Sequence, residues 1–121
     1  MFETEYCKVE YLKNQNAVFC QWKKFCNAEN YRAPFEYGLK LINEHNASIW
    51  ITDTTHGFEN EAADTQWQLQ TFIPKVIDSS CDTIVFIIQE DSPLKEEIEQ
   101  HEAGLSDYFK VQKVSSLEAV I

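Results

Sequence analysis

One short polar segment holds residue types that could do acid–base or nucleophilic chemistry. Asp53, Thr54, Thr55 and His56 stand together directly after an apolar run. Asp53 and His56 offer a carboxylate and a base, and either threonine could act as a nucleophile. No glycine-rich turn adjoins the threonines to supply an oxyanion hole. A hydrolase-type enzyme that uses His56 and Asp53 is therefore a distant alternative, and the plainer interpretation is that Asp53 and Thr54 cap the loop by local hydrogen bonds.

A second polar segment, Glu90 and Asp91, follows the apolar run 83–88. Together with Asp53, these carboxylates could hold Mg²⁺ or Ca²⁺ through oxygen. Their spacing does not match an EF-hand, and the short histidine and cysteine spacings of zinc sites are absent. The chain has only three glycines, so neither a P-loop nor a dinucleotide fingerprint can be written. We therefore expect no bound metal and no cofactor.

The first half of the chain predicts a hairpin followed by a helix. Residues 5–12 alternate and residues 17–22 are apolar and aromatic, with turn chemistry between them, which is typical of an antiparallel β-hairpin. Phe35, Gly38 and Ile42 then recur at helical spacing. This helix is expected to carry Pro34 in its first turn and to end near residues 45–46.

The second half alternates strand and helix. Residues 48–52 and 83–88 are rich in β-branched side chains and predict buried strands. A helix with Asp64 as its N-cap should run through Trp67 and kink or restart at Pro74. The last expected elements are a helix over residues 93–104, a strand over 109–114 and a short helix opened by a capping box at 115–118.

The resulting order is β-β-α-β-α-β-α-β-α, which predicts an α/β domain with a mixed sheet whose later strands run parallel. Ligands of open α/β sheets bind beyond the carboxyl ends of parallel strands. If the two buried strands are neighbours, one rim would be lined by Asp53, Thr54, Thr55, His56, Trp67, Glu90 and Asp91.

Five segments carry a likeness to a known family: the hairpin over residues 5–22, the helix around 31–45, the strand at 50–53, the helical segment 66–74 and the strand 84–88. In this pattern the chain resembles the SpoIIAA-like superfamily, which includes the STAS domains (sulfate transporters and anti-sigma-factor antagonists). It resembles most closely the small stand-alone STAS/SEC14-like proteins of bacteria. The resemblance spans nearly the whole chain and implies a SpoIIAA-like fold.

The resemblance also implies a candidate phosphoswitch. In regulatory STAS proteins, a phosphorylatable serine lies in an Asp-Ser-Ser-Gly motif at the start of the helix after the third strand. The nearest equivalents here are Asp64-Thr65 and Asp53-Thr54, so Thr65 and Thr54 are the candidate phosphorylation sites. The chain departs from the motif in that Trp67 stands where a small residue would be expected.

Composition narrows the class of protein. A length of 121 residues fits a single domain over residues 1–121, and a net charge of −10 disfavours nucleic acid and anionic membranes as partners. Residues 61–121 hold twelve acids and four bases, so −8 of this charge lies in the second half. The start of the chain lacks a signal-peptide pattern, no apolar run could cross a bilayer, and the widely spaced cysteines are expected to be reduced, so we expect a cytoplasmic protein.

Two functions fit these observations better than catalysis. The first is a non-enzymatic protein-interaction or regulatory module that binds a protein partner or forms a homodimer, through its acidic face or the rim near Asp53. The alternative is a small apolar-ligand (lipid-like) carrier, with a pocket between the sheet and the helices that bear Phe35 and Trp67. The SEC14-like part of the resemblance favours such a pocket, whereas large aromatic residues commonly form the core of a small domain.

Overall fold

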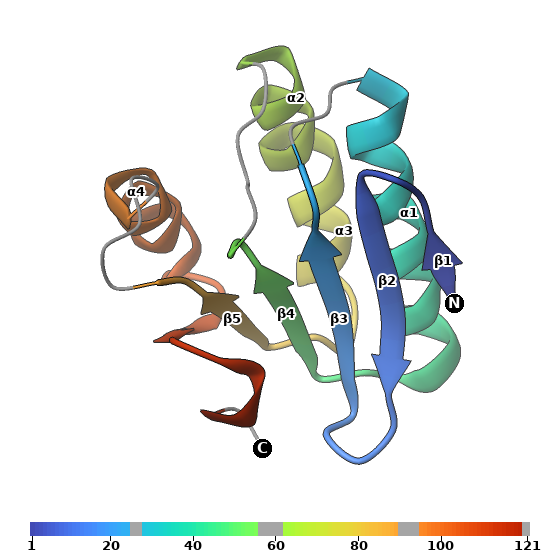
Figure 1. Ribbon diagram of the computed structural model, residues 1–121. Helices are drawn as coiled ribbons and strands as arrows, with labels where there is room; N and C mark the ends of the chain where they lie inside the picture. The colour runs from blue at the N-terminus through green and yellow to red at the C-terminus, as the bar shows by residue number, and fades with distance from the viewer. Residues whose placement is uncertain (25–27, 56–61, 90–94, 120–121) are drawn as a thin grey trace.

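One six-stranded sheet organises the chain, and its strands lie side by side in sequence order (Figure 1). The computed structural model describes residues 1–24, 28–55, 62–89 and 95–119. The strands are β1 (Phe2–Glu3), β2 (Cys7–Leu12), β3 (Ala17–Trp22), β4 (Ile49–Asp53), β5 (Thr83–Ile87) and β6 (Lys110–Val114). The pairs β1–β2 and β2–β3 are antiparallel, and the pairs from β3 to β6 are parallel. The prediction of an α/β domain with a mixed sheet is confirmed.

The hairpin of β2 and β3 is present, with Leu12 opposite Ala17 on either side of the turn. Strand β1 was not expected, because two residues are too few to show an alternating pattern. It is held at the edge of the sheet by pairing with β2 and by Lys23, whose Nζ lies 2.8 Å from a Glu3 carboxylate oxygen and 3.0 Å from the Thr4 carbonyl oxygen. The observed order of elements therefore begins with three strands rather than two.

The helices cover one face of the sheet. Each crossover between parallel strands moves to the adjacent strand in the same direction, and such connections are right-handed, so successive helices fall on the same side. Figure 1 shows α1, α2 and α3 on this side. Leu105 of α4 (Lys95–Leu105) belongs to the same buried cluster as the α1 residues, which places α4 there too.

Two apolar clusters lie on opposite faces of the sheet. The larger one, between the sheet and the helices, is rich in aromatic residues and includes Trp22, Tyr31, Phe35, Trp50, Phe72 and Phe86. The smaller one, on the other face, consists of Ala17, Phe19, Ile51, Val85 and Ile87. Leu117, in a 3₁₀ turn at Leu117–Ala119, packs on this smaller cluster. The capping-box segment thus forms a single 3₁₀ turn in place of the short helix that was expected.

Helix α1 (Ala28–His45) begins earlier than the sequence predicts, and Pro34 lies inside it rather than in its first turn. A proline at this position removes one backbone hydrogen bond of the helix. Tyr31 and Phe35 are both buried on the large cluster, so extending the helix through the proline stabilises it by apolar burial. Packing has here outweighed the local preference of proline.

The next helical segment is built from three pieces: α2 (Ala62–Trp67), the π-helix η1 (Gln68–Phe72) and α3 (Ile73–Ile77). The expected break at Pro74 takes the form of the π turn that precedes it, in which the Ile73 N–H donates to the Gln68 carbonyl oxygen. The prediction that Asp64 is an N-cap is wrong, because Asp64 is the third residue of α2. The segment therefore continues past its proline instead of starting again.

The predicted start of the α4 helix, at residues 92–93, lies outside the described residues. The helix ends at Leu105, one residue past the predicted end. Among the helices that the structure describes, none has both the length and the apolar character needed to span a bilayer.

Candidate functional site

Asp53 ends β4 at the carboxyl edge of the parallel strands, as the sequence predicts. It is only 8% exposed. Its carboxylate accepts hydrogen bonds from Gln21 Nε2 at 3.3 Å and from the Thr55 backbone N–H at 2.9 Å. The contact with Thr55 is the local capping bond expected for an aspartate in a turn. The carboxylate thus fixes the end of β4 and joins it to β3.

Thr54 is more deeply buried, at 2% exposure. Its hydroxyl donates to the Ile87 carbonyl oxygen at 2.7 Å, and its backbone N–H donates to the same oxygen at 3.0 Å. A hydroxyl has one proton to donate, so this bond occupies the proton that a general base would have to remove. Thr54 therefore extends the pairing of β4 with β5 past Asp53, and phosphorylation at this position would require the end of β4 to open.

The described residues include only part of the predicted rim. Asp53 is the last residue of β4, and Thr54 and Thr55 follow it, with Thr55 exposed. His56, Glu90 and Asp91 lie outside the described residues, so their proposed place on the rim stays a prediction. Trp67 lies at the end of α2, where it is half-buried.

An ion pair that the sequence did not suggest links α1 to α2 beside Trp67. Asp64 is 2% exposed, and its Oδ2 accepts the backbone N–H of Ala28 at 2.9 Å, at the first residue of α1. Its Oδ1 accepts Arg32 Nε at 3.2 Å. The Arg32 guanidinium also lies over the Trp67 ring, 5.5 Å from the centroid. Asp64 thus caps the neighbouring helix rather than its own.

Thr65, the candidate phosphorylation site next to Asp64, is half-buried in the first turns of α2.

No local pattern could have revealed the capping contact, because Asp64 is far from Ala28 and Arg32 along the chain. An acidic residue near the start of a helix is ordinarily assigned to that helix.

The interior between the sheet and the helices is closed. Its cavity has a volume of about 20 Å³, with room for one water molecule. The residues that line it are mostly large and apolar: Phe35, Trp50, Thr52, Gln68, Phe72, Ile73, Val76, Ile84, Phe86 and Leu105. The polar groups nearby are paired, because Trp50 Nε1 donates to Thr52 Oγ1 at 2.7 Å and the Tyr31 hydroxyl donates to Gln68 Oε1 at 3.2 Å. The aromatic residues are therefore packed against one another rather than around a ligand space.

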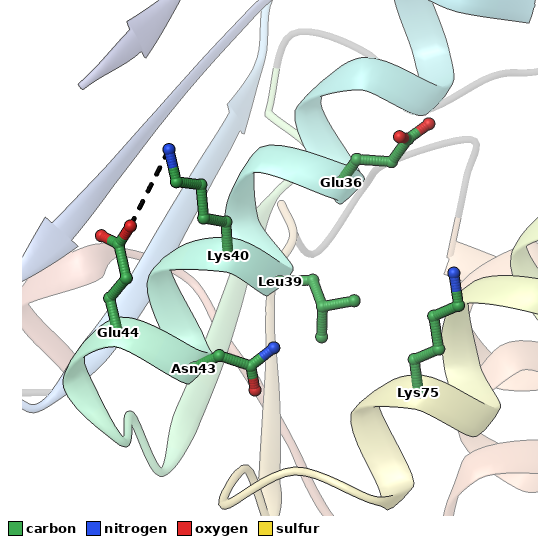
Figure 2. Close-up of a pocket in the computed structure, with 6 residues that line it drawn as sticks. All are labelled: Glu36, Leu39, Lys40, Asn43, Glu44 and Lys75. Carbon is green, nitrogen blue, oxygen red and sulfur yellow. Dashed lines mark ion pairs between the residues drawn. The ribbon is translucent and has the colours of Figure 1, made fainter.

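A wide, shallow groove of about 470 Å³ lies outside the core, between α1 and α3. Its described lining residues are Glu36, Leu39, Lys40, Asn43, Glu44 and Lys75. Figure 2 shows Leu39 and Asn43 directed from α1 toward the side on which Lys75 rises from α3. Lys40 and Glu44 form an exposed ion pair at 3.8 Å. With two lysines and two glutamates, the lining is charge-balanced, unlike the apolar lining typical of small-molecule pockets.

A smaller cleft of about 230 Å³ lies between the α2–η1 segment and α4. In the described part of the chain it is lined by Thr65 and Leu69 on one side and by Gln100 and Gly104 on the other. None of these four residues carries a charge.

Three of the four cysteines, Cys7, Cys20 and Cys81, are described, and all three are buried. The Sγ atoms of Cys7 and Cys20 lie 3.4 Å apart. Burial raises the pKa of the Cys81 thiol from 9.0 to about 11. Within residues 1–24, 28–55, 62–89 and 95–119, no group of three or more His, Cys, Asp or Glu residues could hold a metal ion.

The comparisons with known proteins do not assign a family. No family model matches the chain, and no curated protein matches it either.

Proposed function

We propose that this chain is a non-enzymatic protein-interaction module with a STAS-like fold, which acts in the cytoplasm through its helical surface. The observation that carries the proposal is the contrast between a closed interior, with a cavity of about 20 Å³, and the depressions of about 470 and 230 Å³ between the helices. A domain with a filled core and depressions on its helical surface is suited to bind other chains at that surface.

The closed interior counts against the alternative of a small apolar-ligand carrier. Ligand pockets usually enclose about 300–1,000 Å³. The space between the sheet and the helices that bear Phe35 and Trp67 is far smaller. A carrier would have to separate Phe35, Trp50 and Phe72, whose ring centroids lie 4.8–5.8 Å apart.

The hydrogen bonds at the rim count against the hydrolase alternative. A nucleophilic threonine must donate its proton to a base, whereas the Thr54 hydroxyl donates to a backbone carbonyl. Asp53 is bound to Gln21 and to the Thr55 backbone, so both of its carboxylate oxygens already accept hydrogen bonds. Asp53 and Thr54 therefore each have a structural role that explains their position.

The STAS-like assignment is supported by the pattern of the chain. Parallel strands follow a hairpin, and crossover helices cover one face of the sheet. Of the two candidate phosphorylation sites, Thr65 is favoured over Thr54, because Thr65 is half-buried near the start of a helix and Thr54 is almost fully buried. A phosphate at Thr65 would add negative charge beside the cleft between α2 and α4.

Photo-crosslinking in the source cells tests the proposal. The photoreactive amino acid benzoylphenylalanine would replace one exposed residue at a time on different elements: Glu44 in α1, Leu69 in η1, Lys75 in α3 and Gln112 in β6. We expect a covalent adduct with a second polypeptide from at least one helical position. If every variant folds and none forms an adduct with another chain or with a second copy, the interaction module is refuted.

A further inference from the structure

The cleft between the α2–η1 segment and α4 has an apolar wall that is open to solvent. Buried residues of the α2–α3 segment recur every four positions (Asp64, Gln68, Phe72, Val76) and face the core. Leu69 lies one position past Gln68, on the flank that lines the cleft, and is 48% exposed. An exposed leucine beside a concave surface can bury further apolar area when a partner covers it.

The opposite wall of the cleft contains an unfilled position. A Cβ atom added at Gly104 would meet no atom within 4 Å. Packing therefore does not require glycine here, although glycine disfavours the helix that contains it. The absence of a side chain on this wall leaves space beside Gln100 and opposite Leu69.

The size and lining of the cleft indicate the kind of group that fits. A volume of about 230 Å³ is below the range of pockets that enclose drug-sized ligands. The four described lining residues are uncharged, so an apolar side chain packed against them would leave none of the four as a buried, unpaired charge.

The net charge selects the flanks of such a segment. The chain has a net charge of −10, and residues 61–121 carry twelve acids against four bases. Glu96, four positions before Gln100 in α4, is exposed, whereas Glu99 lies 3.8 Å from Lys113 of β6. Positively charged residues on a partner would be attracted to this acidic chain, and negatively charged ones would be repelled.

We propose that this cleft binds a segment of a partner protein in which an apolar side chain is flanked by lysine or arginine residues. The inference rests on the proposed function, for which it names a site and a partner chemistry. The apolar side chain would pack between Leu69 and Gly104, and a flanking cation would lie beside the exposed Glu96 of α4. The groove between α1 and α3 is less suited to this segment because its charges are balanced.

Fluorescence anisotropy with the full chain tests the proposal. The probe is a short fluorescein-labelled peptide with one central phenylalanine between pairs of lysines, and the matched peptide has glutamates in place of the lysines. We expect saturable binding of the lysine peptide, weakened by added salt, and no binding of the glutamate peptide.

The variant Gly104→Leu fills the cleft and should weaken binding of the lysine peptide about tenfold, equivalent to roughly 1.4 kcal/mol. Asn43→Leu places the same side chain in the α1–α3 groove and should leave binding unchanged. If Gly104→Leu does not fold, Leu69→Gln, at an exposed position, should give the same loss.

Each contrary result overturns the site: no binding of the lysine peptide, equal binding of the two peptides, or no effect of a folded cleft variant. Photo-crosslinks from Glu44 or Lys75, but not from Leu69, would leave the interaction module standing and remove only the cleft.

Discussion

The two helical glycines in α1 and α4 predict opposite responses to alanine. Gly38 lies in α1 directly over the indole of Trp50, and a Cβ built there would be 2.3 Å from Trp50 Cζ3 and 2.4 Å from Cη2. Gly104 lies in α4, where a Cβ would meet nothing within 4 Å. A comparison of Gly38→Ala with Gly104→Ala therefore isolates the effect of the contact with Trp50.

The magnitudes follow from helix propensity and packing. Alanine in place of glycine stabilises an exposed helix by about 0.5–1 kcal/mol, which is the gain expected for Gly104→Ala. At Gly38 the clash opposes this gain, because carbon atoms pack best at about 3.5–4.0 Å. Trp50 cannot easily move, since Phe35 stacks on it and its Nε1 donates to Thr52 Oγ1. An overpacking cost of about 3 kcal/mol less the propensity gain gives a net destabilisation of about 2 kcal/mol for Gly38→Ala.

Urea denaturation followed by circular dichroism and tryptophan fluorescence measures both effects. We expect the unfolding midpoint to fall for Gly38→Ala and to rise for Gly104→Ala. The slope of the unfolding free energy against urea concentration should be similar for both variants and the wild type. A Gly38→Ala variant as stable as the wild type would refute the close approach of α1 to Trp50, and with it the closed packing of the core.

Two further predictions concern the buried carboxylate and the buried thiol. Asp64→Ala should lower the free energy of unfolding by about 2–3 kcal/mol, because it removes the acceptor that caps the Ala28 N–H and the ion-pair partner of Arg32. The control Asp107→Ala, at an exposed position, should change the free energy of unfolding by less than about 0.5 kcal/mol. Equal urea midpoints for the two variants would contradict the capping role. The pKa of the Cys81 thiol is about 11 in the folded state, against an ordinary 9.0. Because the thiolate is the form that reacts, iodoacetamide at mildly alkaline pH should alkylate Cys81 at least ~100-fold more slowly in the native chain than in the urea-unfolded chain. Peptide mass spectrometry measures both rates. Because the folded state holds the Cys81 proton more tightly, the free energy of unfolding should also fall as the pH rises between these two values, and rapid native alkylation would show that the thiol is not buried.

The main strands and the hairpin could be predicted from the sequence because their signals are local. Thr83–Ile87 is an uninterrupted β-branched and aromatic run, and the alternation of β2 is visible over its six residues. Each such strand is buried where its pattern indicates. The mixed sheet then follows from the order of the elements and the handedness of crossover connections.

The errors lie where contacts between distant segments decide the outcome. Pro34 suggests a helix start by its own chemistry, but the burial of Tyr31 and the cap from Asp64 extend α1 past it. Because Asp64 caps the Ala28 N–H of α1, it is not the N-cap of α2 that its local sequence suggests. A two-residue strand such as β1 exists only through its partner, so its own sequence does not reveal it.

The candidate site was predictable only in part. Asp53 and Thr54 do lie at the carboxyl edge of β4, yet their side chains hold strands together. The cleft at Leu69 and Gly104 depends on how α4 packs beside the π turn, which a single sequence does not encode locally. The sequence does show that most of the net charge falls in residues 61–121.

Native mass spectrometry of the full chain, purified without denaturants from its source cells, distinguishes a protein that functions by its surface from one with an internal pocket. We expect the polypeptide mass of 14.1 kDa, alone or with other polypeptide chains, and no retained small molecule. A small apolar molecule bound in a one-to-one ratio, and released on denaturation, would refute function by the surface alone.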